Sequence, residues 1–173
     1  LELPQIHSFP PLFTRQPNQE TFISQRASWI ALILFYYKAK RLHQLPITEE
    51  TLDNELFHNQ AIGRRLKLET LREIIEEMVQ QGSAIYTSKA KTGAYIYWRR
   101  PEEWAARLQK YIEDTGQTGS VLTVYELTQE DRVADQDFYQ LDPAILRSAI
   151  QVLAKKGKAQ MMKGSDGEEV GIK

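Results

Sequence analysis

The side chains that most often perform catalysis or bind metal are few and scattered in this sequence. Its three histidines are His7, His43 and His58, and no two of them stand at the spacing of a zinc site on a helix. There is no cysteine, which excludes disulfides, a cysteine nucleophile and an iron–sulfur cluster. The sequence also lacks a Walker A loop and a G-x-S-x-G nucleophile elbow. We therefore expect no enzymatic activity, no metal site and no cofactor.

Two stretches have compositions that resemble functional loops. Residues 116–120, Gly-Gln-Thr-Gly-Ser, look like a phosphate-binding loop, but they lack the lysine and the preceding strand that such a loop requires. Residues 130–137 contain four acidic side chains, a composition that is typical of a solvated surface. We interpret both stretches as ordinary connections between elements.

The strongest candidate for a binding element is a segment rich in proline and aromatic residues near the N-terminus. Phe-Pro-Pro-Leu-Phe at 9–13 favours the extended polyproline II conformation, which would present aromatic side chains to a partner's pocket. The residues alone also allow a tail that packs on its own first domain, or a disordered end. Pro-Pro-Leu-Phe is similar to a WW-domain ligand too, with Phe13 in place of the usual tyrosine.

An internal repeat relates the two halves of the chain. The interval between Trp29 and Trp104 also separates several other matching pairs, namely Ile33 and Leu108, Tyr36 and Tyr111, Leu71 and Leu146, Ile75 and Ile150, and Gly82 and Gly157. Self-similarity at one interval is typical of a duplicated domain. We expect an N-terminal segment at 1–20, a first domain at 21–99 and a second domain at 100–173.

Both copies show the same order of elements. In the first copy the pattern predicts a helix at 21–41 with Thr21 as N-cap, an extended piece at 45–47, helices at 57–65 and 68–81, and strands at 84–88 and 94–98. In the second copy it predicts a helix at 101–115, an extended piece or short helical turn at 121–127, a helix from Pro143 to Gly157, and strands at 158–163 and 169–173 around the turn Gly164-Ser165-Asp166-Gly167. Helices followed by a β-hairpin are typical of the winged helix. The predicted fold is therefore mainly α with small β-hairpins (α+β), as tandem winged-helix domains.

The charge pattern argues against nucleic acid as a partner. A winged helix reads DNA with its third helix, and in the first copy that helix carries an excess of acidic residues: Glu69, Glu73, Glu76 and Glu77 against the single Arg72. Phosphates repel such a helix. The formal net charge of the whole chain is −1. A DNA-binding transcription regulator of the winged-helix class remains the alternative interpretation.

Three stretches resemble one known family. They are Phe-Pro-Pro-Leu-Phe-Thr-Arg-Gln-Pro-Asn at 9–18, Trp-Arg-Arg-Pro-Glu-Glu-Trp at 98–104 and Val-Leu-Thr-Val-Tyr-Glu-Leu at 121–127. Phe138, Leu141-Asp142 and the closing Ser165-Asp166-Gly167 fit the same pattern, which is similar to the small-subunit family of the ESCRT-II endosomal sorting complex. Some members carry a further proline-proline-aromatic motif upstream, where this chain has Leu3-Pro4-Gln5-Ile6.

The resemblance implies a non-catalytic subunit that helps to sort ubiquitinated cargo into multivesicular bodies. It implies docking to the two larger ESCRT-II subunits through the N-terminal motif, for which we expect contacts from Phe9, Pro10, Pro11, Leu12, Phe13, Thr14, Gln16 and Pro17. It also implies that the second winged helix recruits an ESCRT-III subunit, and the basic residues of its third helix would face that partner: Arg147, Lys155 and Lys156. The same basic residues could instead only complement the dipole of their helix. The expected location is cytoplasmic, with recruitment to endosomal membranes only indirectly, through the complex.

Overall fold

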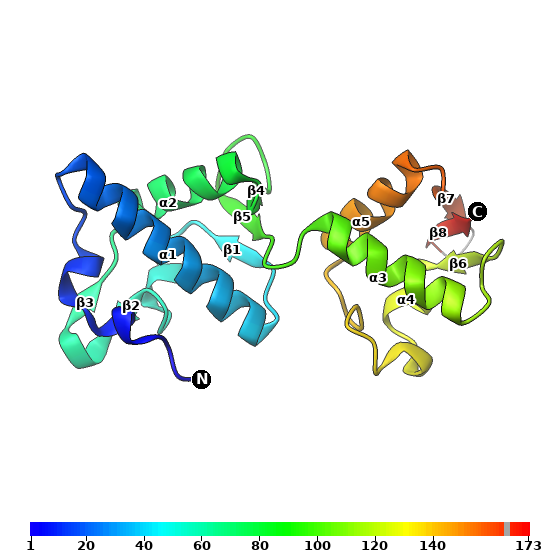
Figure 1. Ribbon diagram of the computed structural model, residues 1–173, viewed down its shortest axis with the longest axis horizontal. Coiled ribbons are helices and arrows are strands. Elements are labelled where there is room, and N and C mark those ends of the chain that lie inside the picture. The colour runs from blue at the N-terminus through cyan, green and yellow to red at the C-terminus, as the bar shows by residue number, and fades with distance from the viewer. Residues whose placement is uncertain (165–166) are drawn as a thin grey trace. The chain divides into compact units, whose positions relative to one another are not determined.

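The chain folds into two compact units, Leu1–Trp98 and Arg99–Lys173 (Figure 1). The structure is a computed structural model, and it describes residues 1–164 and 167–173. Each unit packs its helices against a three-stranded antiparallel sheet, with a β-hairpin at the end of the unit. The predicted fold class of helices with small β-hairpins is therefore confirmed.

The longest helix, α1 (Gln19–Lys40), provides one face of the core of the first unit. It begins two residues before Thr21, the position that we predicted as its N-cap. The N-cap is Asn18, because its side chain accepts a hydrogen bond of 3.1 Å from the backbone N–H of Thr21. Thr21 itself stands at the third helical position. Trp29 and Ile33 of α1 are fully buried.

The other elements of the first unit complete the winged-helix pattern. They are β1 (Gln44–Pro46), β2 (His58–Asn59), β3 (Arg64–Arg65), α2 (Leu68–Gln81), β4 (Ala84–Tyr86) and β5 (Gly93–Ile96). The sheet has the order β1-β5-β4. Gly82 caps the end of α2, and its φ of +80° suits a glycine at this position.

The short helix expected at 57–65 is absent from the described chain. Strands β2 and β3 pair there instead, around a 3₁₀ turn at Gln60–Ile62. Two local features favour the turn: the side chain of Asn59 accepts a hydrogen bond from the N–H of Ala61, and Gly63 has a φ of +63°. The flanking residues Phe57 and Leu66 are buried, so packing in the core stabilises the pairing of β2 with β3.

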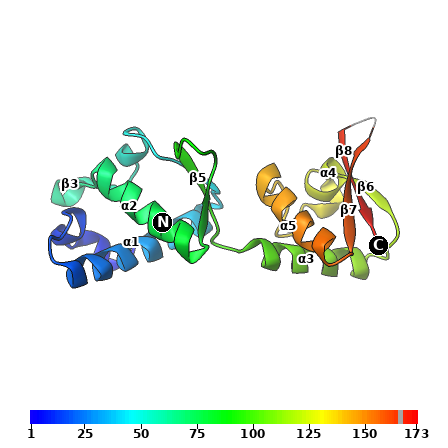
Figure 2. The same ribbon diagram turned by 90° about the horizontal axis from the view of Figure 1, so that it is seen from above.

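The second unit repeats the arrangement with its own elements (Figure 2). They are α3 (Pro101–Asp114), β6 (Val121–Thr123), α4 (Val124–Thr128), a 3₁₀ turn at Asp131–Val133, α5 (Pro143–Lys155), β7 (Ala159–Gly164) and β8 (Gly167–Ile172). The sheet has the order β6-β8-β7. Gly164 pairs with Gly167 at the tip of the hairpin, and the two central residues of the predicted turn, Ser165 and Asp166, lie outside the described residues.

Candidate partner-binding site

The N-terminal segment forms two 3₁₀ turns, Gln5–Ser8 and Pro10–Phe13, so the polyproline II interpretation is wrong. Phe9 between them is extended, as a residue before proline should be. Pro10 and Pro11 open the second turn, where their missing N–H groups cost no hydrogen bond. The turn is closed by hydrogen bonds from the N–H of Leu12 to the carbonyl of Phe9 and from the N–H of Thr14 to the carbonyl of Pro11.

The second half of this segment belongs to the core of the first unit. Leu12 is only 3% exposed and Phe13 only 4%. The ring of Phe13 packs edge-on against Trp29, with ring centroids 5.2 Å apart, and against His7 at 5.5 Å. The N-terminal segment is therefore part of the first unit and does not form a separate tail. For Leu12 and Phe13, the structure agrees with the alternative in which the segment packs on its own domain.

Gln25 of α1 fixes the backbone of the segment. Its side chain is 7% exposed and donates hydrogen bonds of 2.8 Å to the carbonyls of Leu12 and Thr14. Its carbonyl oxygen accepts a hydrogen bond of 3.1 Å from the N–H of Gln16. Our sequence reasoning missed this residue, although a glutamine one helical turn before the buried Trp29 is a signal that a buried polar partner is needed.

A second set of contacts holds the start of the segment. The Nε2 of the buried His7 lies 2.7 Å from the carbonyl oxygen of Leu56. The side-chain amide of Asn59 donates a hydrogen bond of 2.9 Å to the backbone carbonyl of His7. His7 therefore anchors the turn Gln5–Ser8 to the region around β2, an interaction that its isolated position in the sequence did not reveal.

An exposed face remains on the outside of this anchored segment. Phe9 is 53% exposed, and Pro10, Pro11, Thr14 and Pro17 are exposed as well. Gln16 is half-buried, because its side-chain amide bonds to the carbonyls of Pro11 and Thr14. A groove of about 240 Å³ runs beside this face and is lined mainly by Ile6, Phe9, Pro11, Gln16, Ser24 and Ser28. Of the eight residues that we expected to contact a partner, Leu12 and Phe13 are turned inward.

Three of the four acidic residues of α2 form contacts within the first unit. Arg15 makes two hydrogen bonds to Glu73, of 2.9 and 3.0 Å, and Arg26 forms an ion pair with Glu77 at 3.4 Å. The hydroxyl of Tyr86 donates a hydrogen bond to Glu76, which lowers the pKa of that carboxyl. Two causes together raise the pKa of Tyr86 to about 12: mainly burial of the side chain, and secondly its hydrogen bond to Glu76. These acidic side chains thus have structural roles.

The three basic residues expected to face a partner in the second unit are not gathered at one place. Arg147 bonds to Glu168 of β8 at 3.0 and 3.1 Å, and this contact lowers the pKa of the Glu168 carboxyl. Lys155 and Lys156 lie at the other end of the same helix, where α5 ends, and both are exposed. Arg147 is therefore separated from the two lysines along α5.

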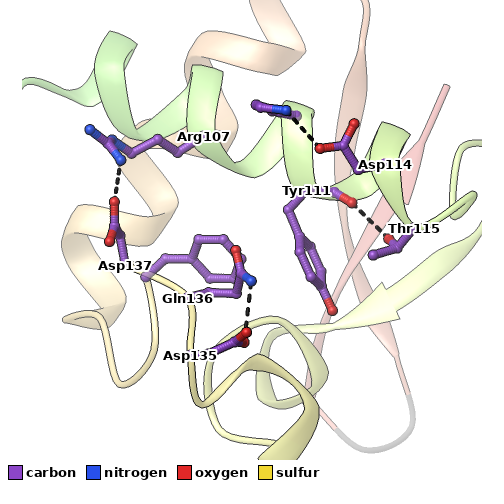
Figure 3. A pocket seen from close by; sticks show the side chains of 9 residues that line it. Arg107, Tyr111, Asp114, Thr115, Asp135, Gln136 and Asp137 are labelled. Carbon is purple, nitrogen blue, oxygen red and sulfur yellow. Dashed lines mark hydrogen bonds and ion pairs between the residues drawn. The ribbon is translucent and has the colours of Figure 1, made fainter.

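The second unit also contains a groove of about 370 Å³ between α3 and the loop that precedes α5 (Figure 3). Tyr111 and Phe138 contact each other edge-on beside it, with ring centroids 5.3 Å apart. Four of its charged side chains form two ion pairs, Arg107 with Asp137 and Lys110 with Asp114. Asp137 therefore links the acidic loop to α3 through its ion pair with Arg107, and it is not only a solvated surface residue. Among the residues that line the groove we find no nucleophile paired with a base.

Among residues 1–164 and 167–173, no three His, Cys, Asp or Glu side chains come together as a set that could hold a metal ion. None of the helices described there combines the length and apolar character required to cross a bilayer.

Comparison with known proteins gives the family. The family model described as "ESCRT-II complex subunit" matches residues 6–142. Vacuolar protein-sorting-associated protein 25 of Schizosaccharomyces pombe is 39% identical over 175 residues, which span 100% of this chain and 98% of that protein.

Two solved structures agree with the sequence match. A crystal structure of subunit VPS25 of the endosomal trafficking complex ESCRT-II has a TM-score of 0.87 at 28% identity, covering 99% of this chain and 98% of that one. The VPS22/VPS25/VPS36 crystal structure of endosomal complex ESCRT-II gives 0.84 at 28% identity, covering 98% of each chain. The resemblance found in the sequence is thus confirmed, and this chain belongs to the family of ESCRT-II complex subunits.

Proposed function

We propose that this chain docks on the two larger ESCRT-II subunits through the exposed face of its N-terminal segment. The observation that carries this proposal is the contrast within one short turn: Phe9 is 53% exposed, while Leu12 and Phe13 are buried a few residues later. A large aromatic side chain that is exposed to solvent beside a groove is typical of an interface anchor. The contact residues would be Phe9, Pro10, Pro11, Thr14, Gln16 and Pro17.

The buried part of the segment would support docking by keeping its backbone in place. Hydrogen bonds from Gln25 and from the indole of Trp29 converge on the carbonyl of Leu12. A segment that is already ordered loses less conformational entropy when it binds, so more of the contact energy appears as affinity. Leu12 and Phe13 therefore act indirectly in this proposal, as the anchors that hold Phe9 in position.

The proposal has a second part, in which the second unit recruits an ESCRT-III subunit. We expect a partner helix to lie along the third helix of this unit, α5, and its hairpin. Lys155 and Lys156, exposed at the end of α5, favour a partner helix that is partly acidic. In this role the chain would contribute to sorting of ubiquitinated cargo into multivesicular bodies and would reach endosomal membranes through the complex.

Calorimetric titration of the two co-purified larger subunits with the full chain tests the docking proposal. Phe9→Ala should weaken binding by at least about tenfold, as the loss of an interface anchor does. Ile85→Ala is the matched control, because Ile85 on β4 has similar exposure in the same unit and lies outside the segment. Wild-type affinity of the Phe9 variant would rule out the proposed docking face.

A further inference from the structure

Helix α1 has apolar residues on both of its faces. One face contributes Trp29 and Ile33 to the core, as expected for a helix on the edge of a domain. The opposite face is exposed yet carries Ile23, Ala27, Ala31 and Phe35, which recur at every fourth position. Ile23 is 48% exposed and Phe35 42%. Single exposed apolar residues are ordinary, but a continuous stripe along three turns of helix is typical of an interaction surface.

The exposed face of α1 is also uncharged over most of its length. Arg26 is the only charged residue between Glu20 and Lys38, and it is turned toward α2, where it pairs with Glu77 at 3.4 Å. The hydroxyl of Ser28 donates a hydrogen bond of 3.1 Å to the carbonyl of Ser24 within the same helix, so it needs no external partner. Depletion of charge is the compositional feature of the centre of a protein interface.

This stripe is continuous with the groove beside the N-terminal segment. Ser24 and Ser28 line that groove together with Phe9, and successive turns of α1 place Ala27, Ala31 and Phe35 next to them. Figure 2 shows α1 along one edge of the first unit. The aromatic anchor and the helical stripe therefore form one surface, which we name the α1 face and define by Ile23, Ser24, Ala27, Ser28, Ala31 and Phe35.

We infer that the α1 face packs against an uncharged helix of the same larger subunit that receives Phe9. This inference rests on the proposed docking function and extends it from the N-terminal segment to α1. The side chains at its centre, Ser24, Ala27, Ser28 and Ala31, are small, so that a second helix can approach closely, while Ile23 and Phe35 at the two ends limit its position.

The chemistry of the α1 face disfavours other occupants. A charged partner surface would lose its hydration there without gaining a compensating charge. An anionic membrane surface is bound by helices whose polar side is rich in lysine and arginine, and the one arginine beside this stripe is already paired with Glu77. An uncharged helix of the subunit that binds Phe9 matches the neutral character of the α1 face. It can also reach this face, because the α1 face is continuous with the groove beside Phe9.

The test measures binding of full-length variants to the two co-purified larger subunits by calorimetry. Ala27→Arg and Ala31→Arg place a charge within the α1 face, and arginine has nearly the helix propensity of alanine, so folding should be retained. Each variant should weaken binding by at least about tenfold, because the new charge would be buried without a partner. Ala31→Ser should keep wild-type affinity, since it leaves the face small and uncharged.

The matched control is Ala106→Arg, the same change at an exposed alanine on α3 of the second unit, which should not alter binding. If both arginine variants of α1 bind with wild-type affinity while Phe9→Ala weakens binding, the inference is wrong and the docking proposal stands. If Phe9→Ala also binds normally, both fail. If the arginine variants change only self-association of the isolated chain in sedimentation velocity, the occupant is a second copy and the inference is overturned.

Discussion

The indole Nε1 of Trp29 donates a hydrogen bond of 2.8 Å to the carbonyl oxygen of Leu12. Both residues are buried, and the bond joins the N-terminal segment to the middle of α1. The side-chain amide of Gln25 reaches the same carbonyl from one turn earlier in the helix. This shared acceptor makes the segment an integral part of the first unit and leaves Phe9 as its outward-facing aromatic residue.

Phe13→Ala should destabilise the protein. The ring of Phe13 is buried against Trp29, so its removal leaves a cavity and should lower the free energy of unfolding by about 3–5 kcal/mol. Urea unfolding of the full chain, followed by tryptophan fluorescence, measures this change. Phe9→Ala serves as the comparison and should stay within about 0.5 kcal/mol of the wild type, because Phe9 is exposed. Equal stability of the two variants would contradict the inward position of Phe13.

Gln25→Leu should loosen the N-terminal segment. The variant removes the bonds to the carbonyls of Leu12 and Thr14 and to the N–H of Gln16, at a cost of about 1–3 kcal/mol. Hydrogen exchange should become faster at the amides of residues 12–16, while α2 stays protected. Gln19→Leu at the exposed start of α1 should leave the exchange of the segment unchanged. Unaltered exchange in the Gln25 variant would show that Trp29 alone fixes the backbone.

Tyr86→Phe should destabilise the first unit more at neutral than at acid pH. The hydroxyl of Tyr86 lowers the pKa of Glu76 in the folded state, so this contact adds stability above the ordinary glutamate pKa. That contribution is lost as the pH falls through the lowered folded-state value. Chemical unfolding at about pH 7 and about pH 3 should therefore show a difference between variant and wild type that shrinks in acid. Tyr125→Phe, at an exposed tyrosine, should show no difference at either pH.

Duplex DNA should bind only weakly and without sequence preference. The acidic residues of α2 would oppose phosphates, and the formal net charge is −1. Fluorescence anisotropy at physiological salt should give dissociation constants no tighter than the non-specific range of ~10⁻⁴–10⁻⁶ M. Nanomolar, sequence-selective binding would instead favour the transcription-regulator alternative.

Charge reversal at the end of α5 should weaken recruitment of the ESCRT-III partner. Lys155→Glu combined with Lys156→Glu would repel a partly acidic helix, and binding of the partner's N-terminal helix to the full chain should fall and lose its salt dependence. Lys110→Glu on α3 is the control, because Lys110 already forms an ion pair with Asp114. An unchanged affinity of the double variant would leave the two lysines with a helix-dipole role only.

The duplicated architecture and the long elements could be predicted from the sequence. Trp29 and Trp104 stand at equivalent positions of the repeat, and both are fully buried in their own units. Helices α2 and α5 begin and end close to the predicted residues, because Gly82 and Pro143 act locally, through backbone angles that do not depend on the rest of the chain. The family motifs were readable for the same reason, since they are continuous in the sequence.

The directions of the N-terminal side chains depend on long-range packing and could not be predicted from the sequence. Apolar character shows that Phe9 and Phe13 both favour burial, but it does not specify whether the surface that covers them belongs to the same chain or to a partner. Phe13 is covered by its own chain, through Trp29 and His7. Trp29 is distant in sequence, and nothing in the sequence around His7 indicates the contact. The prediction of a helix at 57–65 was wrong because Asn59 and Gly63 favour a turn there, and packing against the core stabilises that turn. Local patterns determine which elements form, whereas long-range packing determines which face of each element remains free to bind.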